Sequence, residues 1–292
     1  MPIIFLVTFI GLMGFGIILP LFPFYVERMG ASPEIITLTM AVFSLGQFVA
    51  APLWGRLSDS IGRKPVLILT LLGSGLSYVL LAYAPNLTVV ILSRMLSGLM
   101  AGNVSIAFAY VTDITDDSNR AAGLGKVSAA LGLGFMTGPA IGGLLAGNNV
   151  ENANYLLTAW AAAGINFLAM VAAIVFLKES LDAKKRKPFE GFSKIVELAT
   201  FTPAKSILPL VSCGLIFYTA MSLMESIFPL WANKIFSYGP SHIGGVFFML
   251  GSLGVIIQGG LIGRLTNLFG EKKLVQLAAI SLMAGLILIG SA

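Results

Sequence analysis

The sequence predicts an all-helical protein that crosses a membrane several times. Of its 292 residues, 57% are hydrophobic and only 11% are charged, and the mean hydropathy is +0.92. Soluble domains carry about 25% charged residues, so this composition excludes an ordinary soluble fold. The net charge of +5 lies in short segments between apolar runs, which also excludes the clustered basic surface of a nucleic-acid-binding protein.

Nine apolar runs are long enough to form spanning helices, because a helix needs about 20 residues to cross the hydrocarbon core. The predicted spans are residues 2–25, 35–54, 66–84, 88–111, 122–146, 154–177, 207–235, 241–262 and 274–291. No basic leader or small-residue cleavage site accompanies the first run, so we expect a spanning helix there and not a signal peptide. Cys213 is the single cysteine, which excludes a disulfide framework and a cysteine-based metal site.

The basic residues set the expected orientation. Fifteen of the eighteen Lys and Arg residues follow the second, fourth, sixth or eighth predicted helix. Cytoplasmic loops are rich in these residues, so we expect these segments and the N-terminus to face the cytoplasm. We interpret residues 178–206 as a cytoplasmic linker whose basic run 184–187 is either a simple positive anchor or an anionic-lipid site. It separates an N-terminal six-helix bundle, 1–177, from a partial C-terminal bundle of three helices, 207–292.

A charged stretch after the second predicted helix occurs again after the eighth. Residues 55–67 and 263–273 both begin with Gly-Arg-Leu and both have a glycine seven positions later. Repetition of this kind indicates two related halves that place the same loop after their second helix. We expect Gly55 and Gly62 to let the backbone turn sharply, with Pro65 in the first turn of the next helix. The alternative is a solvated surface turn.

The repeat also predicts that helices are missing from the second half. A second half like the first would contain six helices, but the sequence ends at Ala292 in its third. We therefore expect about nine spanning helices of twelve. Such a chain is either a truncated reading frame or a short form that needs a partner.

Two charged residues inside predicted spans, one basic and one acidic, are candidates for function. Arg94 lies in the fourth predicted helix, where a charge costs about 2.5–3.5 kcal/mol to insert, so we expect it to face the bundle interior. The alternative is an arginine near the helix end that extends to the outer interface. Glu225 lies in the seventh helix and is the candidate proton-carrying carboxylate. Paired structural burial, or a position near the outer water, is the alternative for Glu225.

The fifth predicted helix contains glycine and proline residues at a fixed spacing. They are Gly125, Gly134, Gly138, Pro139, Gly142 and Gly143. Gly134, Gly138 and Gly142 share one helix face, which lets another backbone approach closely, and Pro139 favours a kink. Ordinary close packing explains one or two such glycines, whereas the whole pattern indicates a pliable helix at the interface between the halves.

Together these stretches resemble the major facilitator superfamily, and most closely its drug and proton antiporter branch, which includes bacterial tetracycline exporters. Residues 55–67 resemble the superfamily's loop signature, the spacing from Gly125 to Gly143 resembles its antiporter pattern, and the resemblance covers the whole chain. It implies the major facilitator fold, no enzyme activity, no cofactor or metal, and a bacterial inner membrane. Similar tetracycline exporters carry an acid where this chain has Gly11, which argues against tetracycline as the substrate.

The resemblance also implies roles for individual residues. The implied gating and charge-network residues are Gly55, Asp59, Gly62, Arg63, Asp113 and Arg120. In such a network Asp59 helps to hold the cytoplasmic side closed against a helix N-terminus of the other half, and Arg94 biases the protonation of a nearby acid. The candidate pocket residues, polar or aromatic at membrane depth, are Gln47, Asn103, Asn166, Tyr218 and Gln258.

We therefore expect a secondary transporter that exports hydrophobic or amphipathic small molecules in exchange for protons by alternating access. Its expected partners are the substrate, protons and the lipid bilayer, without nucleic acid, and the complete protein is expected to be a monomer. A sugar or metabolite facilitator of the same superfamily stays open as one alternative. A membrane protein without transport activity, or a truncated remnant, is the other.

Overall fold

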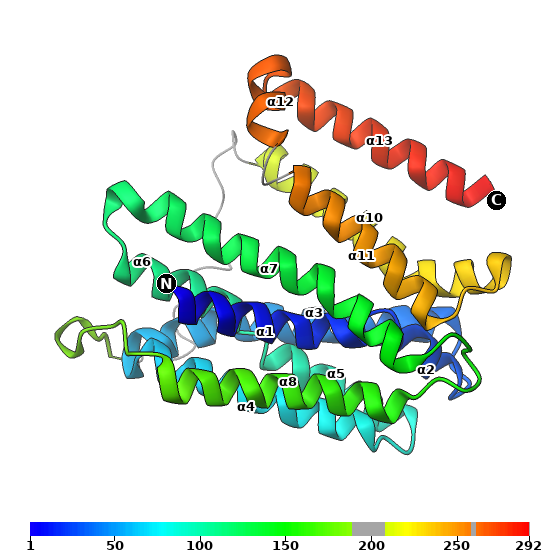
Figure 1. The fold of residues 1–292 in the computed structure, drawn as a ribbon, viewed down its shortest axis with the longest axis horizontal. Helices are drawn as coiled ribbons and strands as arrows, with labels where there is room; N and C mark the ends of the chain where they lie inside the picture. The colour runs from blue at the N-terminus through cyan, green and yellow to red at the C-terminus, as the bar shows by residue number, and fades with distance from the viewer. Residues whose placement is uncertain (189–207, 258–260, 292) are drawn as a thin grey trace.

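The structure is a computed structural model that describes residues 1–188, 208–257 and 261–291 (Figure 1). Every regular element within these ranges is helical. In chain order they are α1 (Pro2–Ile18), α2 (Phe22–Glu27), α3 (Pro33–Ile61), α4 (Arg63–Ala82), α5 (Leu87–Leu99), α6 (Asn103–Ile114), α7 (Asp117–Ala146), α8 (Tyr155–Phe176), the short 3₁₀ helix η1 (Ala183–Lys185), α10 (Leu208–Phe236), α11 (Pro240–Ile256), α12 (Ile262–Phe269) and α13 (Glu271–Ser291).

Each of the nine predicted spans corresponds to one of these helices or to a consecutive pair. By length and composition, seven segments of the described chain could cross a membrane, with α5 and α6 counted as one, and α1 and α11 are shorter apolar helices. The prediction of an all-helical, polytopic membrane protein is therefore confirmed.

Two predicted spans are each broken into two helices. The first is broken between α1 and α2 around Pro20, whose nitrogen cannot donate the hydrogen bond that would continue α1. The fourth is broken between α5 and α6, where the indole N–H of Trp54 from α3 donates to the Leu99 carbonyl and the Trp54 ring lies over Gly102. A side chain from a neighbouring helix thus takes an acceptor that the continuous helix needs.

The core of α1–α8 contains two large apolar clusters with polar residues between them. One cluster contains Ile4 and Val66, and the other contains Ile17 and Leu81. The buried polar residues between them include Ser74, Ser77, Ser97 and Asn166. The Ser77 and Ser97 hydroxyls form a hydrogen bond of 2.7 Å. Because polar groups at membrane depth need partners inside the protein, this layer helps to fix how the helices pack.

The two ends of the helix bundle differ in charge. The basic end holds Met1, the α3–α4 turn and residues 178–188, and the opposite end is called the far end (Figure 1). At the basic end Gly62 separates α3 from α4 with a φ of +112°, and Gly270 separates α12 from α13 with a φ of +76°. Only glycine adopts such backbone angles readily. The matching turns support the repeat that the sequence predicts.

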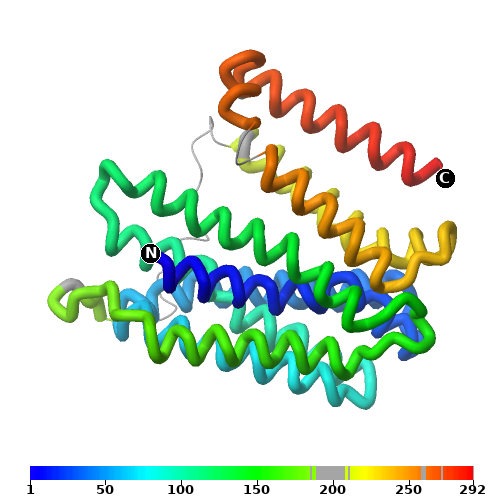
Figure 2. The backbone as a smooth tube through the Cα atoms, in the orientation of Figure 1, coloured from blue at the N-terminus to red at the C-terminus, as the bar shows by residue number. Residues whose placement is uncertain are grey.

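Helices α10 and α11 lie beside α1–α8, and α13 lies beyond them (Figure 2). α11 packs along α7, and α10 contacts α2 and α3. On α10, Ser226 and Ala232 are buried toward the far end, whereas Val211 and Leu215, nearer the basic end, are 53% and 69% exposed. The α10 contacts between the two groups of helices are therefore concentrated toward the far end.

Candidate functional site

Charged side chains from α3, α4 and α6 form a cluster at the basic end. Arg63 forms ion pairs with Asp59 at 2.6 Å and with Asp113 at 2.9 Å, and it donates a further hydrogen bond to Ser58 at 2.6 Å. The Arg63 side chain is only 9% exposed, and a buried charge is tolerated when it has such partners. The structure thus brings together Asp59, Arg63 and Asp113, as the resemblance implied.

Two other residues of the implied network are placed differently. Gly55 lies inside α3 and not in the turn, because α3 stays helical until Gly62. Arg120 does not join the cluster. It pairs with Asp117 at 2.8 Å in the first turn of α7, where a spacing of three residues puts both side chains on one face of the helix. The predictions of a turn at Gly55 and of a cluster contact for Arg120 were therefore wrong.

The segment after α8 completes this cluster, a role that its local sequence does not indicate. The Glu179 carboxylate accepts hydrogen bonds from the backbone N–H groups of Arg63 at 2.8 Å and Lys64 at 3.1 Å. Ser180 donates to Asp113 at 3.1 Å. A carboxylate at a helix N-terminus satisfies unpaired amides and interacts favourably with the helix dipole. The start of the predicted linker is therefore packed against the first six spans.

Arg94 lies in the interior of the bundle. It is 4% exposed, and its guanidinium lies over the rings of Phe22, at 4.9 Å, and Tyr78, at 5.6 Å. Within the described part of the chain, its Nε and Nη2 atoms have no hydrogen-bond partner. Cation–π contacts stabilise the charge but leave these two donors unsatisfied. The interior position is thus observed, and the alternative of an arginine extended to the interface is excluded.

A cavity of about 150 Å³ adjoins Arg94 and lies between the two groups of helices. Helix α10 contributes Ser222 and the half-buried Glu225 to its lining. None of the ion pairs among the described residues joins Arg94 to Glu225. The two charges predicted inside spanning segments therefore share one cavity without being paired.

A second cavity, of about 140 Å³, lies within α1–α8 and is lined by neutral polar side chains. Three predicted pocket residues, Gln47, Asn103 and Asn166, all line it. Phe15 and Phe43 line both cavities, and their rings are stacked with centroids 5.1 Å apart. An aromatic pair therefore lies at the border between a charged cavity and an amide-lined cavity.

The other two predicted pocket residues are not placed in these cavities. Tyr218 is 74% exposed. It lies seven residues, about two helical turns, before Glu225 and so shares its helix face, but it lines neither cavity. The prediction of Tyr218 as a pocket residue was therefore wrong for this structure. Gln258 lies outside the described residues.

The predicted glycine face of α7 packs closely against α1. A methyl group at Gly138 would lie 2.7 Å from the Met13 carbonyl oxygen, and one at Gly134 would lie 2.7 Å from the Phe9 carbonyl oxygen. A methyl group at Gly142 would overlap the Ile17 carbonyl of α1. Since α1 and α7 both belong to the first group of helices, these three glycines pack within that group and not between the halves.

The contact between the halves uses other members of the same pattern. A methyl group at Gly143 would lie 3.1 Å from the Cα of Gly244 on α11, and the Pro139 carbonyl lies against Gly244. Gly125 has no heavy atom within 4 Å of its methyl position and takes no part in close packing. The predicted interface role thus falls on Pro139 and Gly143.

Comparison with known proteins identifies the family. Residues 4–292 match the family model of the Major Facilitator Superfamily. The chain belongs to this superfamily. The chain is 31% identical over 278 residues to Multidrug resistance protein 2 of Bacillus subtilis (strain 168), across 94% of this chain and 68% of that protein. It is 29% identical over 264 residues to the class C tetracycline resistance protein of Escherichia coli, across 89% of this chain and 65% of that protein.

A solved structure supports the major facilitator fold. The crystal structure of the human organic anion transporter MFSD10 matches with a TM-score of 0.70 and 24% sequence identity, over 89% of this chain and 71% of that chain. The chain thus spans about two thirds of the length of the superfamily members that it matches. The predicted family and fold class are both confirmed.

Proposed function

We propose that this chain acts as a proton-coupled exporter of amphipathic small molecules, with its basic end in the cytoplasm. The observation that carries the proposal is the shared cavity of Glu225 and Arg94, in which Arg94 has two donors without partners among the described residues. Relatives named for multidrug and tetracycline resistance support the export of drug-like molecules. The concentration of Lys and Arg in alternate segments supports the orientation.

In the proposed mechanism Glu225 carries the proton. When it is charged, it is attracted by Arg94 across the cavity, and when it is protonated this attraction is lost. A cationic substrate competes with the proton for the same carboxylate, so that binding of one favours release of the other. The exchange involves no covalent step, because the proton and the substrate only change their binding partners.

The linings of the two cavities suggest the class of substrate. Phe15, Phe22 and Phe43 offer apolar ring faces, and Gln47 and Asn166 offer neutral hydrogen-bonding groups. Small-molecule sites typically combine a mainly apolar lining with a few polar groups that fix orientation. We therefore propose a cationic amphipathic substrate. Its cationic group pairs with Glu225, and its apolar body and neutral polar substituents enter the amide-lined cavity when the Phe15–Phe43 pair separates.

Alternating access would come from rocking of residues 1–177 against residues 207–292. The contact of α7 with α11, where glycine backbones lie close together, is the proposed pivot. The cluster of Asp59, Arg63 and Asp113 holds α3, α4 and α6 together at the basic end. We propose that this cluster forms the first-half side of a latch that closes the cytoplasmic face.

The test is proton movement in liposomes that contain the purified chain and a pH-sensitive dye. A lipophilic cation added under a pH gradient should drive proton movement, and Glu225→Gln should reduce this coupled signal by at least about ten-fold. The matched control is Glu34→Gln, since Glu34 is an exposed acid at the start of α3. Full coupling in Glu225→Gln would refute the proton-carrier role. No cation-dependent signal in the unmodified chain would refute the transport activity.

A further inference from the structure

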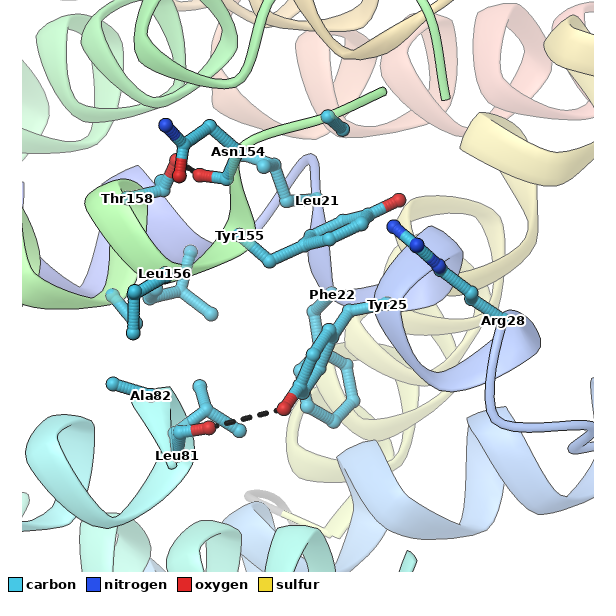
Figure 3. A pocket seen from close by; sticks show the side chains of 13 residues that line it. Leu21, Phe22, Tyr25, Arg28, Leu81, Ala82, Asn154, Tyr155, Leu156 and Thr158 are labelled. Carbon is cyan, nitrogen blue, oxygen red and sulfur yellow. Dashed lines mark hydrogen bonds between the residues drawn. The ribbon is translucent and has the colours of Figure 1, made fainter. Parts of the chain in front are cut away.

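A third cavity, of about 300 Å³, lies at the far end and is separate from the proposed transport site. Figure 3 shows the side chains that line it. It is enclosed by α2, the end of α4 and the start of α8. Ile18, Phe22, Leu81 and Ala159 give it apolar walls, and Phe22 separates it from the Arg94 cavity. Its volume is at the lower end of the range for small-molecule sites, about 300–1,000 Å³.

Arg28 is the charged donor that this cavity leaves available to a ligand. The Tyr25 and Tyr155 hydroxyls each donate to a backbone carbonyl at 3.1 Å, and the Thr158 hydroxyl donates to another at 2.8 Å. The Asn154 side chain accepts a hydrogen bond from a backbone N–H at the start of α8. The guanidinium carbon of Arg28 lies 5.9 Å from the centroid of the Tyr155 ring. No ion pair among the described residues includes Arg28. Figure 3 shows its guanidinium beside that ring.

Two carboxylates line a hollow next to Arg28. Glu27 and Glu151 line a neighbouring hollow together with Arg28, and both are exposed. The ion pairs among the described residues do not include either of them. One cation and two anions are therefore unpaired next to an apolar cavity. This arrangement complements a molecule in which a phosphate, a primary ammonium and an apolar chain lie close together.

The cavity also lies where lipid headgroups are expected. Tyr83 and Trp160 are 64% and 41% exposed, and their rings meet edge to face with centroids 6.0 Å apart. They follow Ala82 and Ala159, which both line the cavity. Exposed Tyr and Trp residues concentrate at the interface between membrane and water. The charged rim is therefore at headgroup level, beside an apolar interior.

We propose that this cavity binds a phospholipid whose headgroup carries a phosphate and a primary ammonium, as phosphatidylethanolamine does. The phosphate pairs with Arg28, the ammonium pairs with Glu27 and Glu151, and part of one acyl chain occupies the apolar cavity. The proposed function enters only in naming the leaflet, which is the outer one if the basic end is cytoplasmic. The site itself is independent of transport.

The test is native mass spectrometry of the full chain in detergent, titrated with phospholipids of identical acyl chains. Phosphatidylethanolamine should bind at least about ten-fold more tightly than phosphatidylglycerol, which lacks the ammonium, and than phosphatidylcholine, whose quaternary ammonium has no N–H donor. Equal binding of all three lipids would overturn the proposal. So would binding of the detergent in their place.

Substitutions test whether the lipid binds at this cavity. Arg28→Gln should weaken binding of all three lipids by about ten-fold or more, because each loses the partner of its phosphate. Glu27→Gln combined with Glu151→Gln should remove the preference for phosphatidylethanolamine while leaving phosphatidylglycerol bound. Lys234→Gln is the matched control, since Lys234 is another exposed cation at the far end but lies outside the cavity lining. Unchanged binding in Arg28→Gln, or an equal loss in Lys234→Gln, would refute the assignment.

Discussion

Gly142→Ala and Gly125→Ala add the same methyl group to the same helix in opposite surroundings. At Gly142 the methyl group overlaps a backbone carbonyl of α1, which cannot rotate away as a side chain can. At Gly125 the methyl position has no heavy atom within 4 Å. The pair therefore separates the cost of close packing from the intrinsic preference of a helix for alanine.

The expected changes in the free energy of unfolding have opposite signs in the two variants. Overpacking costs about 1–3 kcal/mol, and a rigid backbone neighbour places Gly142→Ala at the upper end of that range. Alanine in place of helical glycine returns about 0.5–1 kcal/mol, so we expect Gly142→Ala to lower the free energy of unfolding by about 2 kcal/mol. Gly125→Ala gains the helix preference for alanine without overpacking, so it should raise the free energy of unfolding by about 0.5–1 kcal/mol. The two variants should thus differ by about 3 kcal/mol.

Thermal unfolding in detergent, followed by tryptophan fluorescence at one heating rate, measures this difference. A change of about 2 °C per kcal/mol is typical for chains approaching this size, so Gly142→Ala should melt about 6 °C below Gly125→Ala, with the unmodified chain between them. If Gly142→Ala melts at or above Gly125→Ala, the close approach of α1 and α7 is absent from the folded protein and the reasoning fails.

Three further variants and one control test contacts at the basic end and at the α5–α6 break. Asp113→Asn should destabilise the protein by about 1–3 kcal/mol, because it removes a charge-assisted partner of the buried Arg63, whereas Asp117→Asn, which affects a surface pair, should leave the melting temperature unchanged. Similar melting temperatures for the two variants would contradict this. Glu179→Gln should speed hydrogen exchange in the first turn of α4 without affecting α8, and unchanged exchange would show that the cap is dispensable. Trp54→Phe keeps a ring but loses the donor to α5, so thermal melting should show a loss of about 1 kcal/mol, and wild-type stability would indicate that the break has another cause.

Features encoded by neighbouring residues could be predicted from the sequence. The hydrophobic runs located nine apolar helical segments, seven of which are long enough to cross a membrane within the described residues, because membrane insertion depends on the apolar length of each segment. The turn at Gly62 was predicted because only glycine adopts its backbone angle readily. The expectation that Arg94 faces the interior also depended on a local fact, the cost of exposing a charge to lipid.

Features that depend on tertiary neighbours could not be predicted in the same way. The break between α5 and α6 depends on Trp54, which comes from another helix. Glu179 caps a helix whose first residue lies 116 positions earlier, and nothing in its local sequence indicates that partner. Arg120 was assigned to the charge cluster although Asp117, three residues away, was a nearer partner. Tyr218 was a pocket candidate only because it is aromatic at membrane depth, and its exposure in the fold depends on which part of α10 other helices cover.

The two related turns at the basic end separate backbone geometry from charge. Both turns contain a glycine with positive φ, yet the second has Asn267 and Glu271 where the first has Asp59 and Arg63. Because the second turn forms without an Asp–Arg pair at those positions, the pair is not required to shape the first. A buried arginine is costly unless its partners are well placed. The benefit of the first pair therefore lies in holding three helices together at one end of the bundle, which is what a latch on that face requires.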